Sequence, residues 1–358
     1  METLTVKTTH QSYPIFLGEQ LLQEAEPILE RIYGSQKKRL FVITDTDVAP
    51  LYLDQLKRNL TAHQIVGTFV IPSGEASKSF EMYSQAMTAM LEAKLDRSSV
   101  VIALGGGVVG DLAGFLASTY MRGISFVQMP TTLLAHDSSV GGKTGINHPL
   151  GKNLIGSFHQ PDAVIYDLSL LDSLPKREWL SGFGEVLKHG YIGDQQLLDH
   201  VQSTGVTNIT ASVLRKSIAV KAKIVEADER EKGVRAHLNF GHTIAHALEQ
   251  VSGYGALTHG EAVVNGMAFS LYLSKQLHPS LPIHVDDELH QLQKLGYSFL
   301  PLQTMTWLMI QSMLTDKKNT DSQIADVILV ESQKPSVILL AKEEFETYLN
   351  QFKGEHFS

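Results

Sequence analysis

An apolar strand that runs directly into a glycine-rich turn limits the fold more than any other feature of this sequence. Val100–Leu104 contains only apolar side chains, and Gly105-Gly106-Gly107-Val108-Val109-Gly110-Asp111 follows it without a gap. Glycine permits a tight strand-to-helix turn and a close approach of the backbone to other groups. We therefore expect a buried parallel strand followed at once by a helix.

Further strand and helix signals alternate along the first half of the chain. Short apolar stretches predict strands at Leu40–Asp45, Val66–Pro72, Ser99–Leu104, Phe126–Met129 and Ala163–Tyr166. Between the second and the third, Phe80, Tyr83, Met87, Met90 and Leu91 recur at helical spacing. This alternation predicts βαβ units around a parallel sheet.

Helical spacing dominates after Leu174-Pro175. Val213–Ala227 and Leu238–Val251 predict helices, and Val327–Val330 and Ser336–Leu340 are candidates for short strands. A chain of 358 residues is long for one core. We predict an α/β domain over residues 1–175 with a parallel-sheet nucleotide-binding core, a mainly α-helical domain over residues 176–358, and an active site in the cleft between them.

The composition excludes several classes of protein. There is no cysteine, so any transition-metal site must use His, Asp or Glu, and 15 histidines are available. The net charge of −8 argues against a general nucleic-acid binder. The N-terminus has no signal-peptide pattern, and the longest apolar run, Val100–Ser118, is broken by Asp111 and five glycines. We expect a soluble cytoplasmic protein with no membrane partner.

The glycine-rich turn is a candidate dinucleotide site. Gly105, Gly107 and Gly110 satisfy the G-x-G-x-x-G spacing. The acidic residue expected about 20 positions later is missing, and an acidic residue stands upstream instead, at Asp45. The pattern favours a dinucleotide site whose layout differs from that of an ordinary Rossmann fold. Taken alone, the motif is explained equally well by a tight turn that binds no ligand.

Several lysines and an arginine are candidates for contact with an anionic ligand. Gly142-Lys143-Thr144 lacks the upstream glycine of a P-loop, but a lysine among glycines suggests anion contact, as does Lys152. Lys221 and Arg235 stand in a charged stretch that is otherwise expected to be a solvated helix face. For each of these cations alone, a surface position is the simpler interpretation.

The strongest local signal is a pair of histidines, His242 and His246, at i and i+4 on one helix face, a spacing that suits a divalent metal. Thr243 occupies the position of the glutamate base of metalloproteases, which excludes that class. His259 and Glu185 could contribute further ligands. A lone pair of histidines is more often structural, but two histidines and a carboxylate beside a nucleotide-type loop favour a catalytic metal site.

These motifs occur in one order along the chain, and together they resemble the 3-dehydroquinate synthase family of the shikimate pathway. The resemblance covers nearly the whole chain and rests on Pro72–Lys78, Gly105–Asp111, Tyr120–Gly123, Pro130–Ala135, Gly141–Lys143, Gly151–Gly156, Glu185–Lys188, Asn239–Thr243 and His259–Glu261. The segment Ala135-His136-Asp137 is one residue shorter than the common form of the family, which has Gln-Val before the aspartate.

The resemblance implies the ligands and the residues that hold them. NAD would be bound by Asp45, Glu75, Lys78, Gly107, Val108, Val109, Gly110, Asp111, Thr131, Thr132, Lys143 and Lys152. Zn²⁺ or Co²⁺ would be bound by Glu185, His242 and His259. The substrate pocket would contain Asp137, Asn153, Lys188, Lys221, Glu231, Arg235, Asn239 and His246, completed by Lys317 or Lys318. The family is dimeric, and Arg122 would reach into the neighbouring subunit.

The implied activity is that of a carbon-oxygen lyase acting on a phosphate, in chorismate and aromatic amino-acid biosynthesis. The substrate would be 3-deoxy-D-arabino-heptulosonate 7-phosphate, a phosphorylated sugar acid. Transient oxidation by NAD, β-elimination of phosphate, re-reduction and intramolecular aldol closure would give 3-dehydroquinate without net redox change.

Three other functions remain open on the sequence. A related sugar-phosphate cyclase that makes 2-deoxy-scyllo-inosose or a valiolone would share the NAD and metal framework. Retention of Lys152, Asn153, Arg235 and Asn239 favours the shikimate substrate over these. A metal-dependent polyol dehydrogenase would not need the cations, and a non-enzymatic binding module would not explain why the histidines, Glu185 and the glycine loop occur together.

Overall fold

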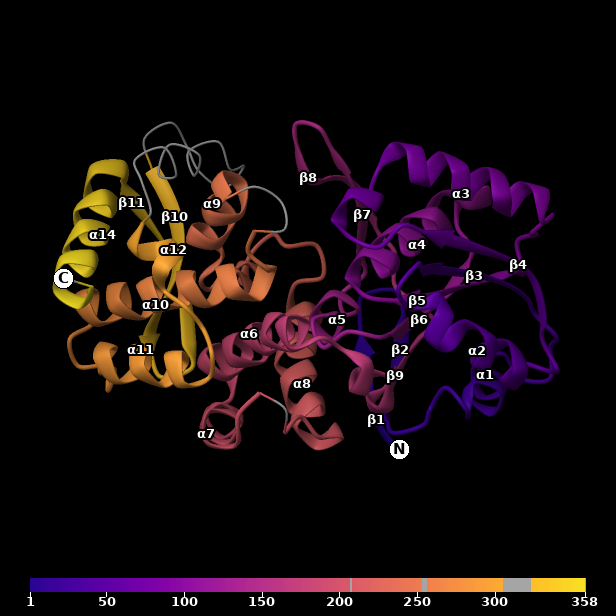
Figure 1. The fold of residues 1–358 in the computed structure, drawn as a ribbon, viewed down its shortest axis with the longest axis horizontal. Coiled ribbons are helices and arrows are strands. Elements are labelled where there is room, and N and C mark those ends of the chain that lie inside the picture. Colours follow the sequence, from indigo (N-terminus) through magenta and orange to yellow (C-terminus); the bar gives the residue numbers. More distant parts are fainter. Residues whose placement is uncertain (207, 253–255, 305–322, 358) are drawn as a thin grey trace. The chain divides into compact units, whose positions relative to one another are not determined.

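The computed structural model describes residues 1–206, 208–252, 256–304 and 323–357, and Figure 1 shows their arrangement. They form two compact units, Met1–Leu174 with Thr210–Arg230, and Pro175–Ile209 with Glu231–Ser358. The first change of unit along the chain falls between Leu174 and Pro175. A single boundary at 175 does not anticipate that residues 210–230 belong with the first unit, where helix α8 (Ala211–Ala227) packs on strands β1 and β2.

The first unit is built on a seven-stranded sheet with the order β1-β2-β9-β6-β5-β3-β4. Its strands are β1 (Glu2–Lys7), β2 (Ser12–Gly18), β3 (Arg39–Asp45), β4 (Gln64–Ile71), β5 (Val100–Gly105), β6 (Ser125–Pro130) and β9 (Ala163–Asp167). Only β1 is antiparallel to its neighbour; the other pairs are parallel. All the predicted strands of this half are confirmed, but the sequence prediction missed β1 and β2. In β1 exposed and partly buried residues alternate, which gives a weak apolar signal, whereas most residues of β2 are buried.

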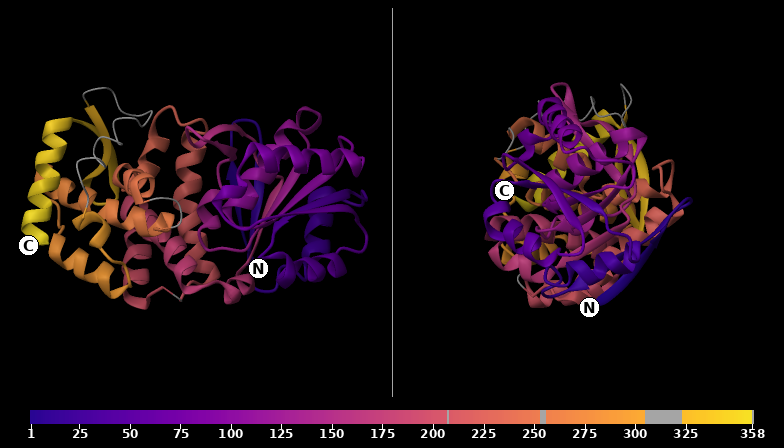
Figure 2. Two further views of the ribbon diagram at one scale, coloured as in Figure 1. Left: turned by 45° about the horizontal axis from the view of Figure 1, so that its top comes forward. Right: turned by 90° about the vertical axis from the view of Figure 1, so that its right-hand side faces the viewer.

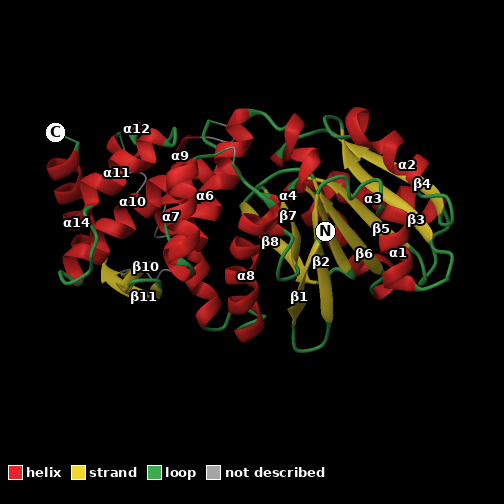
Figure 3. Cartoon of the chain, turned by 90° about the horizontal axis from the view of Figure 1, so that it is seen from below, coloured by secondary structure: helices red, strands yellow, loops and turns green. Residues whose placement is uncertain are grey.

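Helices cover both faces of this sheet, as Figures 2 and 3 show. On β3, Leu40 and Val42 pack in one core with α1 (Ala25–Tyr33) and α2 (Asp54–Asn59). The alternate residues Phe41 and Ile43 pack in a second core with α3 (Phe80–Glu92) and α4 (Gly107–Thr119). Because both faces of the sheet are buried, the central strands have continuous apolar sequences rather than alternating apolar and polar residues.

The chain changes its direction of winding between β3 and β5. From β3 it proceeds outward to the edge strand β4, and then returns across β3 to continue with β5 and β6 on the other side. In open α/β sheets, the carboxyl ends of the strands at such a switch point are where ligands bind. In this chain those ends are Asp45 and Gly105, on adjacent parallel strands.

The segment that contains Gly142-Lys143-Thr144 and Gly151–Gly156 forms a second small sheet. Strands β7 (Lys143–His148) and β8 (Gly151–Phe158) pair as an antiparallel hairpin. A Cβ atom on Gly156 would lie 2.1 Å from the carbonyl oxygen of Thr144, so the two backbones can approach only because glycine stands there. The sequence prediction missed this hairpin because glycine weakens a strand signal.

The second unit is mainly helical. It contains α6 (Lys176–Gly193), α7 (Gln195–Thr204), α9 (His242–Ser252), α10 (His259–Leu277), α11 (Val285–Lys294), α12 (Leu300–Gln303) and α14 (Lys342–His356), with the strands β10 (Gln323–Glu331) and β11 (Lys334–Ala341). Helix α10 is buried along most of its length and packs against α6, α9 and β10. The predicted combination of an α/β first half and a mainly helical second half is confirmed, as are the two late strands.

The helix predicted over Leu238–Val251 begins later than expected. Residues Val234–Asn239 form a 3₁₀ turn, and α9 starts only at His242. Gly241, which separates them, has a φ of +78°, a backbone conformation that favours glycine and ends the turn. Within the part of the chain that the structure describes, no helix is long and apolar enough to cross a membrane.

Asp326 on β10 is a buried acid in this second unit. Its carboxylate accepts a hydrogen bond from Ser270 on α10 at 3.3 Å, and burial raises its pKa to about 7. The same carboxyl in the unfolded chain has a pKa of about 3.9. Between these two values the folded chain holds a proton that the unfolded chain has lost, so raising the pH lowers the free energy of unfolding.

We predict that Asp326→Asn removes this pH dependence. The variant should gain stability over the wild type, and the gain should be larger at pH 8 than at pH 5 by roughly 2–3 kcal/mol. Urea unfolding at both pH values measures the difference. The exposed Asp287→Asn serves as the control, and equal gains at pH 5 and pH 8 for Asp326→Asn would contradict the prediction.

Candidate active site

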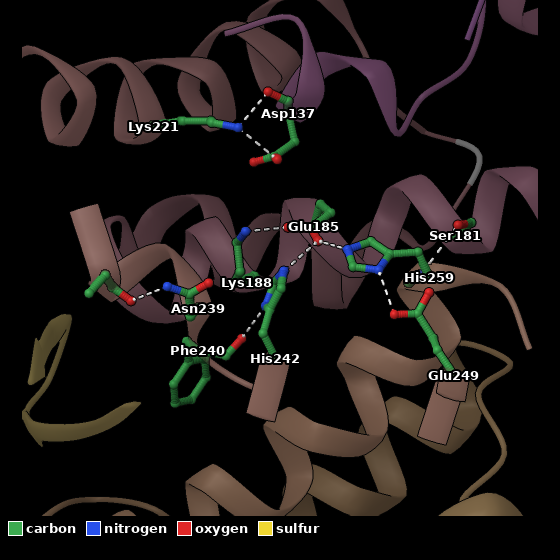
Figure 4. A network of polar contacts seen from close by, with 12 residues as sticks. Asp137, Ser181, Glu185, Lys188, Lys221, Asn239, Phe240, His242, Glu249 and His259 are labelled. Carbon is green, nitrogen blue, oxygen red and sulfur yellow. Dashed lines mark hydrogen bonds and ion pairs between the residues drawn. The ribbon is translucent and has the colours of Figure 1, made fainter. Parts of the chain in front are cut away.

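Glu185, His242 and His259 meet in the second unit, although they come from three different helices. Oε1 of Glu185 on α6 lies 3.1 Å from Nε2 of His259 on α10 and 3.6 Å from Nε2 of His242 on α9 (Figure 4). One possible ligand atom from each residue lies within 4.8 Å of the others. The structure therefore brings together the three predicted metal ligands around one point.

Glycines at the helix crossings allow this approach. Gly184, next to Glu185, packs against Gly260, next to His259. A Cβ atom on Gly184 would lie 2.8 Å from the carbonyl oxygen of Gly260. A Cβ atom on Gly260 would lie only 1.9 Å from the carbonyl oxygen of Ser181. A second crossing pairs Gly266 on α10 with Gly241, where a Cβ on Gly266 would lie 1.8 Å from the Gly241 carbonyl oxygen. Each ligand thus neighbours a residue that lets two backbones touch.

The outward nitrogen of each histidine also faces an acceptor. Nδ1 of His242 lies 3.2 Å from the carbonyl oxygen of Phe240, and Nδ1 of His259 lies 3.5 Å from a carboxylate oxygen of Glu249. A hydrogen on Nδ1 leaves the lone pair on Nε2, the atom that faces Glu185. This is the tautomer that a metal-binding histidine needs, and such acceptors commonly fix it.

The electrostatic surroundings of the two imidazoles differ. Burial, together with the charge of Lys188, holds the pKa of His242 well below its usual range, so this ring is neutral. Burial also disfavours a charge on His259, but hydrogen bonds to Glu185 and Glu249 outweigh it and raise the pKa of His259 to about 10. A positive charge is therefore favoured beside Glu185, whose other carboxylate oxygen pairs with Lys188.

Other predicted pocket residues lie in the same unit. The His246 ring stands edge-on to His242 at 5.6 Å between centroids. Asn239 donates to Ala236 at 3.0 Å and to Glu231 at 3.5 Å. Arg235 is among the largest fully buried side chains. Lys188 is also buried, so that two cations stand in the interior of this unit.

In the first unit, the predicted nucleotide-binding residues gather at the carboxyl edge of the sheet. Asp45 ends β3, and its Oδ1 accepts hydrogen bonds from the backbone N–H groups of Asp47 and Val48 at 2.9 Å. Burial raises the pKa of Asp45 above its ordinary value. Thr131 follows β6, and its N–H donates to the Gly105 carbonyl oxygen at 3.1 Å. Three adjacent strands thus present predicted residues side by side.

Helix α4 begins directly at the glycine turn, without a side-chain cap. Gly106 precedes its first residue, and no side chain accepts a hydrogen bond from its first turn. Gly110 and Gly114 bring the helix close to its neighbours, since a Cβ on Gly114 would lie 2.4 Å from the Thr144 side chain. An uncapped helix N-terminus beside a glycine turn is a site for a phosphate group.

A buried lysine connects the glycine helix to the β7–β8 hairpin. Nζ of Lys78 lies 2.6 Å from Asp111 on α4, 2.5 Å from Oδ1 of Asn153 on β8, and 3.7 Å from Glu75. Glu75 in turn accepts a hydrogen bond from Asn147 at 2.8 Å. Burial raises the pKa of Asp111, while the charge of Lys78 opposes this effect. Asn147 is a member of this network that the sequence interpretation did not assign.

Helix α8 carries a second pair in the first unit. Lys221 donates to both the carbonyl oxygen and Oδ2 of Asp137, at 2.6 and 2.7 Å. One turn earlier, Ser217 contacts Nε2 of the fully buried His136 at 3.0 Å, and Nδ1 of that ring lies 2.6 Å from the Leu133 carbonyl oxygen. The shortened segment before Asp137 therefore forms a short helix, α5 (Ala135–Ser138), held to α8 at two points.

The remaining predicted residues lie at or near the surface of the first unit or outside the described residues. Lys143 is exposed and Lys152 is half-buried, on the two strands of the hairpin. Arg122 is exposed in a turn and has a φ of +70°. Thr132 accepts a hydrogen bond from Tyr166 through its carbonyl oxygen at 2.7 Å. Lys317 and Lys318 lie outside the residues that the structure describes.

The residues present fit both implied groups. Two imidazoles and one carboxylate are a common donor set for Zn²⁺ and also suit Co²⁺, and leave coordination positions for a substrate. For NAD, the hydroxyl of Thr131 is buried and has no hydrogen-bond partner among the described residues, at the edge where the uncapped helix begins. A ligand with phosphate and hydroxyl groups would satisfy these donors.

Comparison with known proteins gives a consistent result. The profile described as 3-dehydroquinate synthase N-terminal matches residues 68–181, and the one described as 3-dehydroquinate synthase C-terminal matches residues 182–319. A 3-dehydroquinate synthase of Bacillus cytotoxicus is 46% identical over 362 residues, which cover 99% of this chain and 97% of that protein.

Solved structures of related cyclases have the same fold. The 2-epi-5-epi-valiolone synthase of Streptomyces hygroscopicus subsp. jinggangensis 5008, with NAD⁺ and Zn²⁺ bound, is 26% identical with a TM-score of 0.85, covering 97% of this chain and 98% of that one. A 2-deoxy-scyllo-inosose synthase complexed with carbaglucose-6-phosphate, NAD⁺ and Co²⁺ is 22% identical with a TM-score of 0.84, covering 98% and 99%. At 22% identity, the second likeness concerns the fold alone.

We predict that Gly184→Ala weakens metal binding. The added methyl group meets backbone atoms of Gly260, which cannot rotate away, so α6 and α10 must move apart and separate Glu185 from His259. A loss of about tenfold or more in Zn²⁺ affinity is expected, by analogy with disturbed ligand orientation. Competition with a chromophoric chelator measures it.

Gly354→Ala is the matched control for this prediction, because a Cβ at that position in α14 would meet nothing within 4 Å. It should bind Zn²⁺ as the wild type does. Wild-type affinity in a folded Gly184→Ala chain would show that the glycine contact does not set the ligand geometry.

Proposed function

Because this chain belongs to the 3-dehydroquinate synthase family, we propose that it converts 3-deoxy-D-arabino-heptulosonate 7-phosphate to 3-dehydroquinate and phosphate. The observation that carries the proposal is the meeting of Glu185, His242 and His259 around one point, in a chain whose glycine turn begins an uncapped helix. The same family relationship supports a role in the shikimate pathway and in aromatic amino-acid biosynthesis.

Two bound groups would supply chemistry that side chains lack. Glu185, His242 and His259 would hold Zn²⁺ or Co²⁺, and the carboxyl edge of the sheet with the first turn of α4 would hold NAD. When bound, the metal would polarise the substrate's hydroxyl groups, and NAD would take up one hydride and return it within the same turnover. The reaction is then a lyase reaction without net redox change.

The chain's own residues would bind and orient the two anionic ends of the substrate. Arg235 has a rigid guanidinium fork that matches carboxylate or phosphate, and its burial makes each such hydrogen bond stronger than in water. Lys152, Asn153, Lys221 and His246 would contribute further contacts. Holding both ends would keep the reacting carbons aligned through several steps.

The proposed reaction requires few side chains that act only in proton transfer. The low pKa of His242 keeps its ring neutral, so that its Nε2 lone pair remains available for the metal. The ion pair of Lys221 with Asp137 holds a carboxylate and a cation together, a combination that can donate and accept a hydrogen bond at adjacent substrate hydroxyls. In the elimination, the substrate's own phosphate could accept the proton, so that no protein base is required for that step.

We further propose that the protein works in the cytoplasm as a homodimer, in which the exposed Arg122 reaches the neighbouring subunit. A related sugar-phosphate cyclase is the second candidate, since structures of two such enzymes have nearly the same fold. The higher identity to 3-dehydroquinate synthases, 46% against 26%, favours the shikimate substrate.

The first test follows phosphate and NADH together. The purified chain is given 3-deoxy-D-arabino-heptulosonate 7-phosphate, NAD and Zn²⁺, and phosphate release is measured while absorbance reports NADH. We expect phosphate release that a chelator abolishes, with no accumulation of NADH. Absence of phosphate release would favour another cyclase, and net NADH formed from a simple polyol would indicate a dehydrogenase.

We predict that His242→Ala loses metal and activity together. Removing one of three ligands should lower the bound Zn²⁺ after dialysis to a small fraction of one equivalent, and phosphate release should fall at least about a hundredfold. Elemental analysis and the phosphate assay give both values. His290→Ala, at an exposed position on α11, is the control; full metal content and near-normal turnover in His242→Ala would refute the ligand assignment.

A further inference from the structure

His259 is the least enclosed of the three candidate metal ligands. Its side chain is 30% exposed, whereas that of His242 is 12% exposed and that of Glu185 only 1%. His259 is also the first residue of α10, where the helix begins. An imidazole in this position needs contacts from other elements to hold its ring in one orientation.

Two carboxylates from different helices contact the two ring nitrogens of His259. Nε2 lies 3.1 Å from Glu185 on α6, and Nδ1 lies 3.5 Å from Glu249 on α9 (Figure 4). Glu249 is 13% exposed and lies outside the cluster whose ligand atoms lie within 4.8 Å of one another. It therefore contacts the ligand without reaching the point where the three candidate ligands meet.

His242 is held differently. Its Nδ1 faces the carbonyl oxygen of Phe240, two residues earlier in the same segment. That acceptor is backbone and is fixed by the chain itself, so no side chain is needed to set the tautomer of His242. For His259, the contact to Nδ1 comes instead from a side chain on another helix, that of Glu249 on α9, ten residues earlier.

We propose that Glu249 is a positioning residue for the metal site. Its carboxylate accepts a hydrogen bond from Nδ1–H of His259, which leaves the Nε2 lone pair directed toward Glu185 and makes that nitrogen a stronger ligand. The inference rests on the proposed metal-binding function and deepens it: α9 supplies one ligand through His242 and orients a second through Glu249, one helix face serving both.

The alternative is that Glu249 only ties α9 to α10. A tie of that kind would lower the melting temperature when removed, but it would leave the intrinsic affinity of the folded chain for metal and the electronic structure of the bound ion unchanged. Metal affinity and the absorption spectrum of a Co²⁺-loaded chain therefore separate the two roles.

The experiment uses the full chain and three variants. Glu249→Gln removes the charge at nearly constant shape, and Glu249→Asp keeps the charge but withdraws it by one methylene group. Glu343→Gln, an exposed position on α14, is the control. Zn²⁺ affinity is measured by competition with a chromophoric chelator, the Co²⁺ absorption bands are recorded for each chain, and thermal melting verifies folding.

We expect Glu249→Gln and Glu249→Asp each to weaken Zn²⁺ binding by roughly 10- to 100-fold and to shift the Co²⁺ bands, while Glu343→Gln matches the wild type. Affinities within twofold of the wild type with unchanged bands, in either folded Glu249 variant, would overturn the positioning role alone. A wild-type chain that binds neither metal would overturn the proposed function as well, so the two failures are distinguishable.

Discussion

The approach of α6 and α9 to α10 at glycine residues is the contact on which the candidate metal site depends. Glu185 is 57 residues before His242 and 74 before His259, so no local regularity can bring the three together. Close packing at Gly184, Gly260, Gly241 and Gly266 does so, because each permits two backbones to touch beside a ligand. Packed interiors transmit small displacements, and an added methyl group at any of these crossings would therefore move a ligand.

In the first unit, a buried charged residue connects several elements. Lys78 is almost completely buried and contacts Asp111, Asn153 and Glu75, which belong to a helix, a hairpin and a short turn. A buried ion pair contributes little net stability once the cost of desolvation is included, but an unpaired member would cost several kcal/mol. These contacts therefore fix the position of the β7–β8 hairpin more than they stabilise the fold. If the hairpin shifted relative to α4, a buried charged group would lose its partner.

The sequence predicts those features that local pattern encodes. Unbroken apolar stretches located the parallel strands because both sheet faces are covered, and the motifs indicated the family. It did not predict the return of residues 210–230 to the first unit, the hairpin whose glycines weaken its strand signal, or the break at Gly241. The first depends on contacts between distant segments, whereas the hairpin and the break were obscured by glycines within the segments themselves. Glu249 and Asn147 were missed because neither a helical glutamate nor a strand asparagine indicates by its local sequence which distant residue it contacts.

Spacing alone would select His242 and His246 as the metal pair, and the structure explains why that choice is incomplete. Both stand on α9, but the centre toward which His242 points is defined by the buried Glu185, whose carboxylate has His259 as its nearest histidine. A buried carboxylate needs positive charge or hydrogen-bond donors, and the rings that approach it become the natural ligand set. His246 stands edge-on to His242 and does not belong to the cluster of Glu185, His242 and His259. The position of one buried glutamate thus distinguishes two histidines that spacing alone presents as equivalent.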